Sequence, residues 1–326
     1  MKMNRRTALQ AGAALVAAAS FPVFSQQKPK LRFAAVFSDK DIRADMVRML
    51  QKDVAPDFEV EPFYNGSLFK QGTELVALQR DNLELGNIAP QDFSKQIGSW
   101  SILTSAYLFR DASHLDKFWS GELGAQFKKE AEDKLKVKVL GPTFFGTRQV
   151  GLKPNKKINT PADLAGVKLR MPPGDAWQLL GRSLGANPTP MAYAEVYTGL
   201  QTGAIDGQDN PLPNVQNMKF YEVMSQIVLT SHLVGYDLLT MNLKAWNAMG
   251  AKQKAFQAAA DKAMRWSAAE HLKREAELAD GFRKQGLQVY VPDQNAFRAH
   301  AQKVYLASDE AKEWPKGLLE KINALK

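Results

Sequence analysis

Residues 166–223 read GVKLRMPPGDAWQLLGRSLGANPTPMAYAEVYTGLQTGAIDGQDNPLPNVQNMKFYEV, and this stretch decides the fold. It opens with alternating apolar and basic side chains, the period of a half-buried strand, and Pro172-Pro173-Gly174 ends that strand. Asp175 is suited to cap the helix that follows, and a second helix is expected over residues 193–202. The pattern therefore places Arg170 at the end of a strand, where open α/β sheets bind their ligands.

Taken alone, Arg170 has two interpretations. It can be a solvated arginine, or one paired with an acid at the protein surface, as most arginines are. It can also present its planar fork of donors to a ligand carboxylate in a bidentate pair. Polar side chains crowd a turn-rich segment further along, at residues 206–211, which is a second candidate ligand loop.

The chain before this stretch alternates between apolar strands and helices. They are expected over residues 31–37, 41–52, 58–64, 72–80 and 85–89. This alternation predicts an α/β fold with mostly parallel sheets and right-handed crossovers. Ligand contacts should then lie in the loops after the strands, which contain Glu74 and Gln91. Glu74 can equally cap the N-terminus of its own helix.

Two further strands, at residues 137–145 and 149–152, flank a Gly146-Thr147-Arg148 break. Arg148 resembles Arg170, because it follows an apolar strand beside a glycine that permits close backbone approach. A chain of this length usually splits into two lobes. We expect lobe 1 over residues 26–147 plus 236–275, and lobe 2 over residues 148–235 plus 276–326.

The longest regular segment is a helix expected over residues 251–285, followed by Gly286 as a stop. Its apolar positions from Phe256 to Ala276 recur every four residues. A step of four exceeds the 3.6 residues of a helical turn, so the apolar stripe winds around the helix. This pattern suits one helix that packs first on one lobe and then on the other.

Residues 1–25 have the pattern of an export signal. A basic start precedes a short, Ala-rich apolar run at residues 8–21, which is too short to span a bilayer. We expect cleavage near Ser25 and a periplasmic location, by either the twin-arginine or the general secretory route.

Composition excludes several classes of function. The net charge of +9 falls to +6 without residues 1–25, and the excess is spread along the chain. No Lys/Arg block interleaved with aromatics points to nucleic acid, so we expect no such partner. The absence of cysteine excludes disulfides, thiolate nucleophiles and zinc-thiolate sites. The sequence has no GxSxG or HExxH motif, and its histidines are isolated. We expect no enzyme activity, cofactor or metal; an exported hydrolase would need carboxylates such as Asp206 and Asp209 facing one cleft.

Several motifs together resemble the substrate-binding subunit of tripartite ATP-independent periplasmic (TRAP) transporters, of the DctP type. They are GTRQ at Gly146–Gln149, ADLAGVKLRMP at Ala162–Pro172, GANPTPM at Gly185–Met191, EVYTGLQTGAIDGQDNP at Glu195–Pro211, KFYEV at Lys219–Val223 and LTSH at Leu229–His232. They occur in the family's order, and the weaker likeness around them extends over essentially the whole chain after residue 28.

The resemblance implies a two-lobed periplasmic binding protein fold with a hinge cleft and a long helix backing both lobes. In that picture Arg170 pairs bidentately with the carboxylate of an organic acid, Arg148 adds a second set of donors, and Asn210 holds the same group. Tyr193 and Trp177 would form the apolar wall, although either could instead belong to the core. The partners implied are the small and large membrane subunits of a TRAP transporter.

The ligand expected from these residues is a sugar acid. The stretches 70–74, 172–174 and 235–237 look like the branch of the family that includes uronate and aldonate binders. Glu74 and Asp237 could accept hydrogen bonds from sugar hydroxyls. The alternatives are an aromatic or dicarboxylic acid, or a ligand receptor that signals to a membrane sensor.

Overall fold

The computed structural model describes residues 28–325. Its strands are β1 (Lys30–Ala34), β2 (Glu59–Phe63), β3 (Leu85–Ile88), β4 (Val137–Leu152), β5 (Lys168–Met171), β6 (Asn187–Pro190), β7 (Gly207–Pro211), β8 (Gln226–Asn242) and β9 (Gln288–Tyr290). Its α-helices are α1 (Ile42–Val54), α2 (Glu74–Gln79), α3 (Pro90–Ser94), α4 (Ala112–Ser120), α5 (Glu122–Glu130), α6 (Asp175–Ser183), α7 (Val196–Thr202), α8 (Leu212–Asn217), α9 (Leu243–Ala248), α10 (Gln253–Lys284), α11 (Gln294–Leu306) and α12 (Leu318–Asn323).

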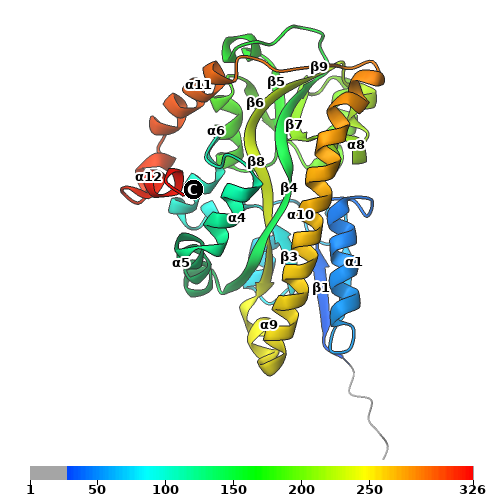
Figure 1. Ribbon diagram of the computed structural model, residues 1–326, viewed down its shortest axis with the longest axis vertical. Coiled ribbons are helices and arrows are strands. Elements are labelled where there is room, and N and C mark those ends of the chain that lie inside the picture. Colours follow the sequence, from blue (N-terminus) through cyan, green and yellow to red (C-terminus); the bar gives the residue numbers. More distant parts are fainter. Residues whose placement is uncertain (1–27, 326) are drawn as a thin grey trace, which may run out of the picture.

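The strands form one mixed sheet in the order β2-β1-β3-β8-β4-β7-β5-β6, with β9 paired to β8. Pairs among the shorter strands, and the pair of β9 with β8, are parallel. The pairs that β4 makes with β7 and β8, and that β3 makes with β8, are antiparallel. The α/β class and the two-lobed architecture are confirmed: β1–β3 with α1–α5 form the lower half in Figure 1, and β5–β7 with α6–α8 and α11 form the upper half.

The two halves are joined by β4 and β8, which are 16 and 17 residues long and pair with each other through both halves. The sequence predicted β4 as two short strands, at residues 137–145 and 149–152, and this prediction was wrong. Gly146, which suggested the break, pairs with Gly235 of β8 inside the ladder. A Cβ atom on Gly235 would lie 2.7 Å from the carbonyl oxygen of Gly146, so glycine permits the close approach here instead of ending the strand.

The segment expected to be a turn at residues 206–211 is also a strand. Its Asp, Asn and Gly residues are typical of turns, yet β7 is buried along its whole length between β4 and β5. Tertiary context overrides the local preference, because the polar side chains of this strand find buried partners. The N-cap of α6 is Gly174 and not Asp175, which is the first residue of the helix.

The expected long helix is confirmed as α10, which has 32 residues. It packs against α1 and β4 in the lower half and against α8 and β9 in the upper half (Figure 1). Phe256 and Met264 belong to one hydrophobic cluster, whereas Leu278 and Phe282 belong to another. The helix does pack on two cores, but the predicted stripe was only partly right: Leu272 is 48% exposed and Ala276 is exposed, and the upper core is reached through Leu278 and Phe282 instead.

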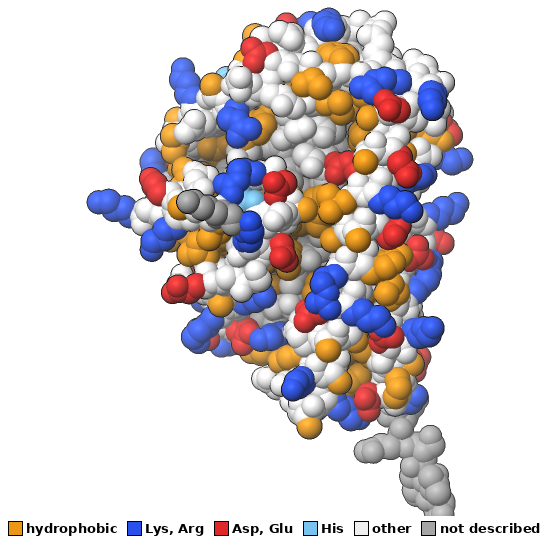
Figure 2. Space-filling model, in the orientation of Figure 1, with side chains coloured by type: hydrophobic (Ala, Val, Ile, Leu, Met, Phe, Trp, Pro, Cys, Tyr) orange, Lys and Arg blue, Asp and Glu red, His pale blue; other side chains and the backbone are white. Residues whose placement is uncertain are grey.

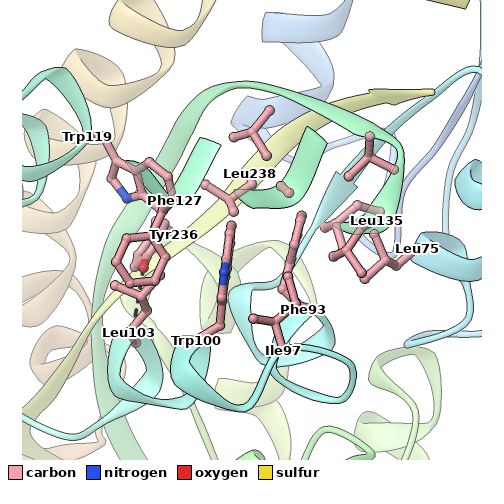
Figure 3. Close-up of a cluster of buried hydrophobic side chains, with 14 of the residues drawn as sticks. Leu75, Phe93, Ile97, Trp100, Leu103, Trp119, Phe127, Leu135, Tyr236 and Leu238 are labelled. Atoms are coloured by element: carbon pink, nitrogen blue, oxygen red, sulfur yellow. Dashed lines mark hydrogen bonds between the residues drawn. The ribbon is translucent and has the colours of Figure 1, made fainter. Parts of the chain in front are cut away.

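A cluster rich in aromatic side chains forms the core behind the middle of β8 (Figure 3). Trp100 stacks on Phe93 with ring centroids 4.4 Å apart. Tyr236 and Leu238 of β8 point into this cluster. Because side chains alternate along a strand, Asp237 between them points to the other face, where the functional site lies.

Residues 1–25, where the export signal is predicted, lie outside the described residues. Within residues 28–325, no helix has the length and apolarity needed to cross a bilayer. Both β4 and β8 pass uninterrupted through the predicted lobe boundaries at residues 147 and 235, and the exact division stays a prediction. Figure 2 shows lysine, arginine and acidic side chains interspersed over the visible face.

Candidate functional site

A cavity lies between the two halves of the sheet, with an empty volume of about 530 Å³ that includes its opening to solvent. Seven of the eight predicted site residues line it: Arg170, Arg148, Asn210, Tyr193, Trp177, Glu74 and Asp237. The eighth, Gln91, instead lines a smaller neighbouring cavity. A short helix starts at Pro90, and within that helix Asp92, not Gln91, faces the main cavity.

Arg170 lies on β5 and is only 1% exposed. Its Nε donates to the carbonyl oxygen of Met191 at 2.9 Å, and its Nη2 donates to Oε1 of Gln71 at 3.2 Å. Both partners are neutral, and no acid of the described chain lies within ion-pair distance of Arg170. Burial lowers the pKa of this guanidinium to about 10, although Asp209 opposes the shift. Within residues 28–325, Arg170 is thus a buried cation with no acid in direct contact.

Arg148 is in a different state, because the structure pairs it with Asp209 of β7. Its Nε and Nη2 contact the two carboxylate oxygens at 2.7 and 2.9 Å, and the ring of Trp177 lies 4.9 Å from its Cζ atom. His232 Nε2 lies 3.2 Å from the same carboxylate. Burial opposes ionisation of Asp209, but Arg148 and His232 hold its pKa well below the usual range. Burial lowers the pKa of His232, so its imidazole is neutral near pH 7.

A third cavity arginine, Arg43 of α1, was missed by the sequence reasoning. Its Nε and Nη2 donate to Asp41 at 3.0 and 2.9 Å, and its Nη1 donates to Asp237 at 2.9 Å. The guanidinium also lies 4.3 Å from the ring centroids of Phe37 and Phe145. The sequence offered only a weak signal, an Asp-Ile-Arg triplet directly after an apolar strand.

Carboxyl groups gather on the wall of the cavity that belongs to the lower half. Burial raises the pKa of Asp237 to about 6, although Arg43 opposes the shift. Glu74 accepts a hydrogen bond from the backbone amide of Gly72 at 2.7 Å, so it both lines the cavity and satisfies the turn before α2. Burial, with a contribution from Asp92, raises the pKa of Glu74 to about 8. At neutral pH Glu74 is mostly protonated and can donate as well as accept.

The amide and aromatic residues complete the opposite wall. Asn210 donates from Nδ2 to Oε1 of Gln208 at 2.6 Å. Tyr193 accepts a hydrogen bond on its hydroxyl from Asn214 at 3.0 Å, and its ring lies 5.8 Å from the Cζ atom of Arg170. Tyr193 and Trp177 are 5% and 6% exposed and pack into hydrophobic clusters while lining the cavity. Both rings therefore belong to the hydrophobic core and to the cavity wall at the same time.

Gln71, which lies in the predicted stretch 70–74 but was not itself named as a site residue, connects the two halves. It lies in the loop between β2 and α2, and its Oε1 accepts from the backbone amide of Tyr193 at 2.8 Å as well as from Arg170. Within residues 28–325, no three His, Asp or Glu side chains gather as they would around a metal ion. Asp206 and Asp209 do not line the cavity. The arrangement is suited to hold an anion at Arg170 and hydrogen-bonding groups at the acid wall.

Comparison with known proteins gives a consistent result. Residues 8–311 match the family described as bacterial extracellular solute-binding protein, family 7, or DctP. A crystal structure of a TRAP periplasmic solute binding protein from Roseobacter denitrificans, with bound 3-deoxy-D-manno-oct-2-ulosonic acid, is 42% identical, with a TM-score of 0.89, over 92% of this chain and 100% of that chain.

Two curated relatives come from Vibrio cholerae. The sialic acid-binding periplasmic protein SiaP is 31% identical over 243 residues, which cover 73% of this chain and 75% of SiaP. The C4-dicarboxylate-binding periplasmic protein DctP is 30% identical over 247 residues, which cover 73% of this chain and 74% of that protein. The ligands named for these three proteins all carry a carboxylate.

Proposed function

The chain belongs to bacterial extracellular solute-binding protein family 7, and from that premise we propose that it captures a sugar acid through Arg170 and delivers it to a TRAP transporter. The family is one of solute-binding transport proteins, and its TRAP members work with membrane subunits. The proposal adds the class of ligand, the arginine–carboxylate pair and the delivery step.

The observation that carries the proposal is the unneutralised charge of Arg170. A guanidinium has five N–H donors, of which Arg170 uses one on Nε and one on Nη2. The remaining donors on Nη1 and Nη2 form the end of the fork, which matches the two oxygens of a carboxylate. A cation buried without an anion is costly, and the attraction between opposite charges is stronger in a dry cavity than in water. An incoming carboxylate would therefore offset the electrostatic cost of burying the Arg170 charge.

Arg148 and Asn210 have supporting roles in this proposal. Because Asp209 already neutralises Arg148, a ligand anion gains less there than at Arg170. The hydrogen bonds of Arg148 to Asp209 use Nε and Nη2, so the N–H groups on Nη1 stay available to the ligand. Asn210 can turn its remaining amide hydrogen toward the same carboxylate.

The acid wall favours a ligand with hydroxyl groups. Asp237, Glu74 and Asn87 line the cavity and offer hydrogen-bond acceptors that an aromatic acid would leave unused. The relative at 42% identity binds an eight-carbon sugar acid, which supports the same class here. A dicarboxylic acid is the second candidate, favoured by the C4-dicarboxylate-binding relative from Vibrio cholerae.

Delivery would take place in the periplasm, after cleavage of the export signal near Ser25. The small and large membrane subunits of a TRAP transporter would be the partners. A receptor that signals to a membrane sensor would use the same cavity. If deletion of this chain abolishes uptake of the ligand by the cells, delivery is supported. If deletion leaves uptake unchanged but abolishes a signalling response to the ligand, the receptor is supported.

Calorimetry on residues 26–326 tests the ligand class. The panel contains 3-deoxy-D-manno-oct-2-ulosonate, D-glucuronate, D-galacturonate, D-galactonate, benzoate, 4-hydroxybenzoate, succinate and malate. We expect a dissociation constant of about 1 μM or lower for at least one sugar acid, which corresponds to about 8 kcal/mol. Binding of aromatic acids alone, or of no acid in the panel, would overturn the proposal.

A further inference from the structure

Contacts within the protein hold the guanidinium of Arg43 in one orientation. Two of its nitrogens grip both oxygens of Asp41, the N-cap of its own helix, at 3.0 and 2.9 Å. The rings of Phe37 and Phe145 hold its guanidinium at 4.3 Å each. With its plane set by these contacts, one N–H of its Nη1 is directed at Asp237.

In this arrangement the two carboxylate oxygens of Asp237 differ: one accepts hydrogen bonds from the protein, and the other is open. Its Oδ2 accepts from Arg43 Nη1 at 2.9 Å and from Asn87 Nδ2 at 3.0 Å. Its Oδ1 makes no side-chain hydrogen bond within residues 28–325, although the residue is only 8% exposed and lines the cavity. This oxygen is not fully buried and its residue lines the cavity, so a donor group of a ligand can reach it.

The charge around this oxygen is negative. Arg43 stands against two carboxylates, those of Asp41 and Asp237, so the group as a whole carries an excess negative charge. Asp92 and Glu74 also line the cavity, but Lys95 pairs with Asp92 at 2.6 Å and Glu74 is mostly protonated at neutral pH, so the excess charge comes from Asp41 and Asp237. Arg170, which has no acid in direct contact within residues 28–325, lines the same cavity from β5 of the upper half. The cavity therefore presents a cation that can take an anion and, at Asp237, a carboxylate group with excess negative charge.

We infer that Arg43 and Asp237 form a specificity filter, which accepts a hydroxyl at the far end of the ligand and rejects a second carboxylate there. The inference rests on the proposed function, since it assumes that the first carboxylate occupies Arg170. A hydroxyl donates to Asp237 Oδ1 and completes its bonding. A carboxylate has no proton to donate and meets a like charge in a low-dielectric site, which is an effective means of excluding a ligand. Asp237 is the residue that touches the ligand, and Arg43 is the positioning residue.

The test compares ligands that differ only at the end opposite the carboxylate. D-galactonate and galactarate differ by one such group, as do D-gluconate and D-glucarate. Titration calorimetry on residues 26–326 in a carboxylate-free buffer measures these four acids, together with the sugar acids of the panel above, succinate and malate. For the wild-type protein we expect the tightest monocarboxylate to bind at least 100-fold more tightly than the tightest dicarboxylate.

Variants assign the effect to the filter. Asp237→Asn removes the charge of Asp237 and keeps its shape. It should narrow the ratio of monocarboxylate to dicarboxylate affinity at least tenfold, by weakening binding of the sugar acid and strengthening binding of the dicarboxylate. Arg43→Lys keeps the charge but loses the fork to Asp41, and should narrow the ratio while leaving binding at Arg170 intact. Asp45→Asn removes an exposed acid of the same helix, which is paired only with Arg48, and should leave the ratio unchanged.

The outcomes separate the two proposals. A wild-type protein that binds a dicarboxylate within threefold of its best sugar acid overturns the filter but leaves the proposed function standing. A ratio that stays the same in Asp237→Asn also overturns it. If Asp237→Asn does not fold, the wild-type ratio and Arg43→Lys still decide the matter. Failure of every acid in the panel to bind overturns the proposed function itself.

Discussion

Replacing Arg170 by Met should have opposite effects on binding and on stability. Arg170 is the cavity cation that lacks an acid partner within residues 28–325, so its removal takes away the group to which the ligand anion would bind. The same removal relieves the unliganded protein of a buried charge. A purely structural arginine would behave differently, because its loss would lower stability and leave binding nearly intact.

Both magnitudes follow from the site. Breaking a desolvated charge pair costs about 2–5 kcal/mol, or roughly 30- to several-thousand-fold in affinity. Burial lowers the pKa of Arg170 from 12.5 to about 10, which corresponds to about 3 kcal/mol of cost to the folded state. Arg170→Met removes this cost but also two hydrogen bonds worth about 1 kcal/mol each. The net expectation for the free energy of unfolding is a gain of about 1 kcal/mol.

Two measurements on one set of proteins check this. Urea unfolding of the unliganded protein gives the free energy of unfolding, and calorimetry with the best sugar acid gives the affinity. Arg170→Lys keeps the charge but not the fork, so it should lose most of the affinity without the gain in stability. Arg182→Met, an exposed arginine of α6, is the matched control and should change neither quantity. A loss of stability above about 2 kcal/mol in Arg170→Met, or near-wild-type affinity in either Arg170 variant, would refute the reasoning.

Three further predictions concern neighbouring residues. Gln71→Glu would give Arg170 an internal carboxylate, and calorimetry should show at least a tenfold loss of ligand affinity together with a higher melting temperature of the unliganded protein; a lower melting temperature would contradict this. For Glu74, a folded-state pKa of about 8 against 4.5 means that its contribution to stability is fully present below about pH 4.5 and is lost as pH rises through about 8, by up to about 5 kcal/mol. Urea unfolding of Glu74→Gln at pH 5 and pH 9 should show a much smaller fall than the wild type, and an equal fall would rule out this origin. Asp209→Asn leaves Arg148 buried without its anion and should cost about 3–5 kcal/mol of unfolding free energy; a cost below about 1 kcal/mol would show that the pair is dispensable.

The fold was predictable where local periodicity agreed with tertiary structure. The alternation of strands and helices and the length of α10 are encoded in short-range patterns, and both predictions are confirmed. The continuity of β4 and β8 was not predictable, because Gly146 and Gly235 carry the same local signal whether they end a strand or let two strands approach closely. Only the pairing partner, some ninety residues away in the sequence, distinguishes the two cases.

The site shows the same division. Arg170 was predicted from the rule that ligands bind at strand ends, whereas the roles of Asn210, Tyr193 and Trp177 came from the family resemblance, and all four line the cavity. Arg43 could not be found in this way, because its role depends on a contact 194 residues distant in the sequence. The loop at residues 70–74 was predicted, but not the contact from its Gln71 to Arg170, 99 residues away. Gln91 was placed wrongly relative to the main cavity, since the start of a short helix at Pro90 changes which side chain faces inward.

The unequal treatment of the three cavity arginines explains how binding and closure can be coupled. Arg148 and Arg43 are neutralised by Asp209 and by Asp41 with Asp237, so each belongs to the fixed wall. Arg170 instead receives a neutral amide, Gln71, from the opposite half of the sheet. The Gln71 amide can accept a hydrogen bond from Arg170 without neutralising its charge. The two halves can therefore meet around Arg170 while binding of an anion there stays favourable. A sugar without a carboxylate would leave that charge buried and unpaired, and the closed arrangement would then gain little from the ligand.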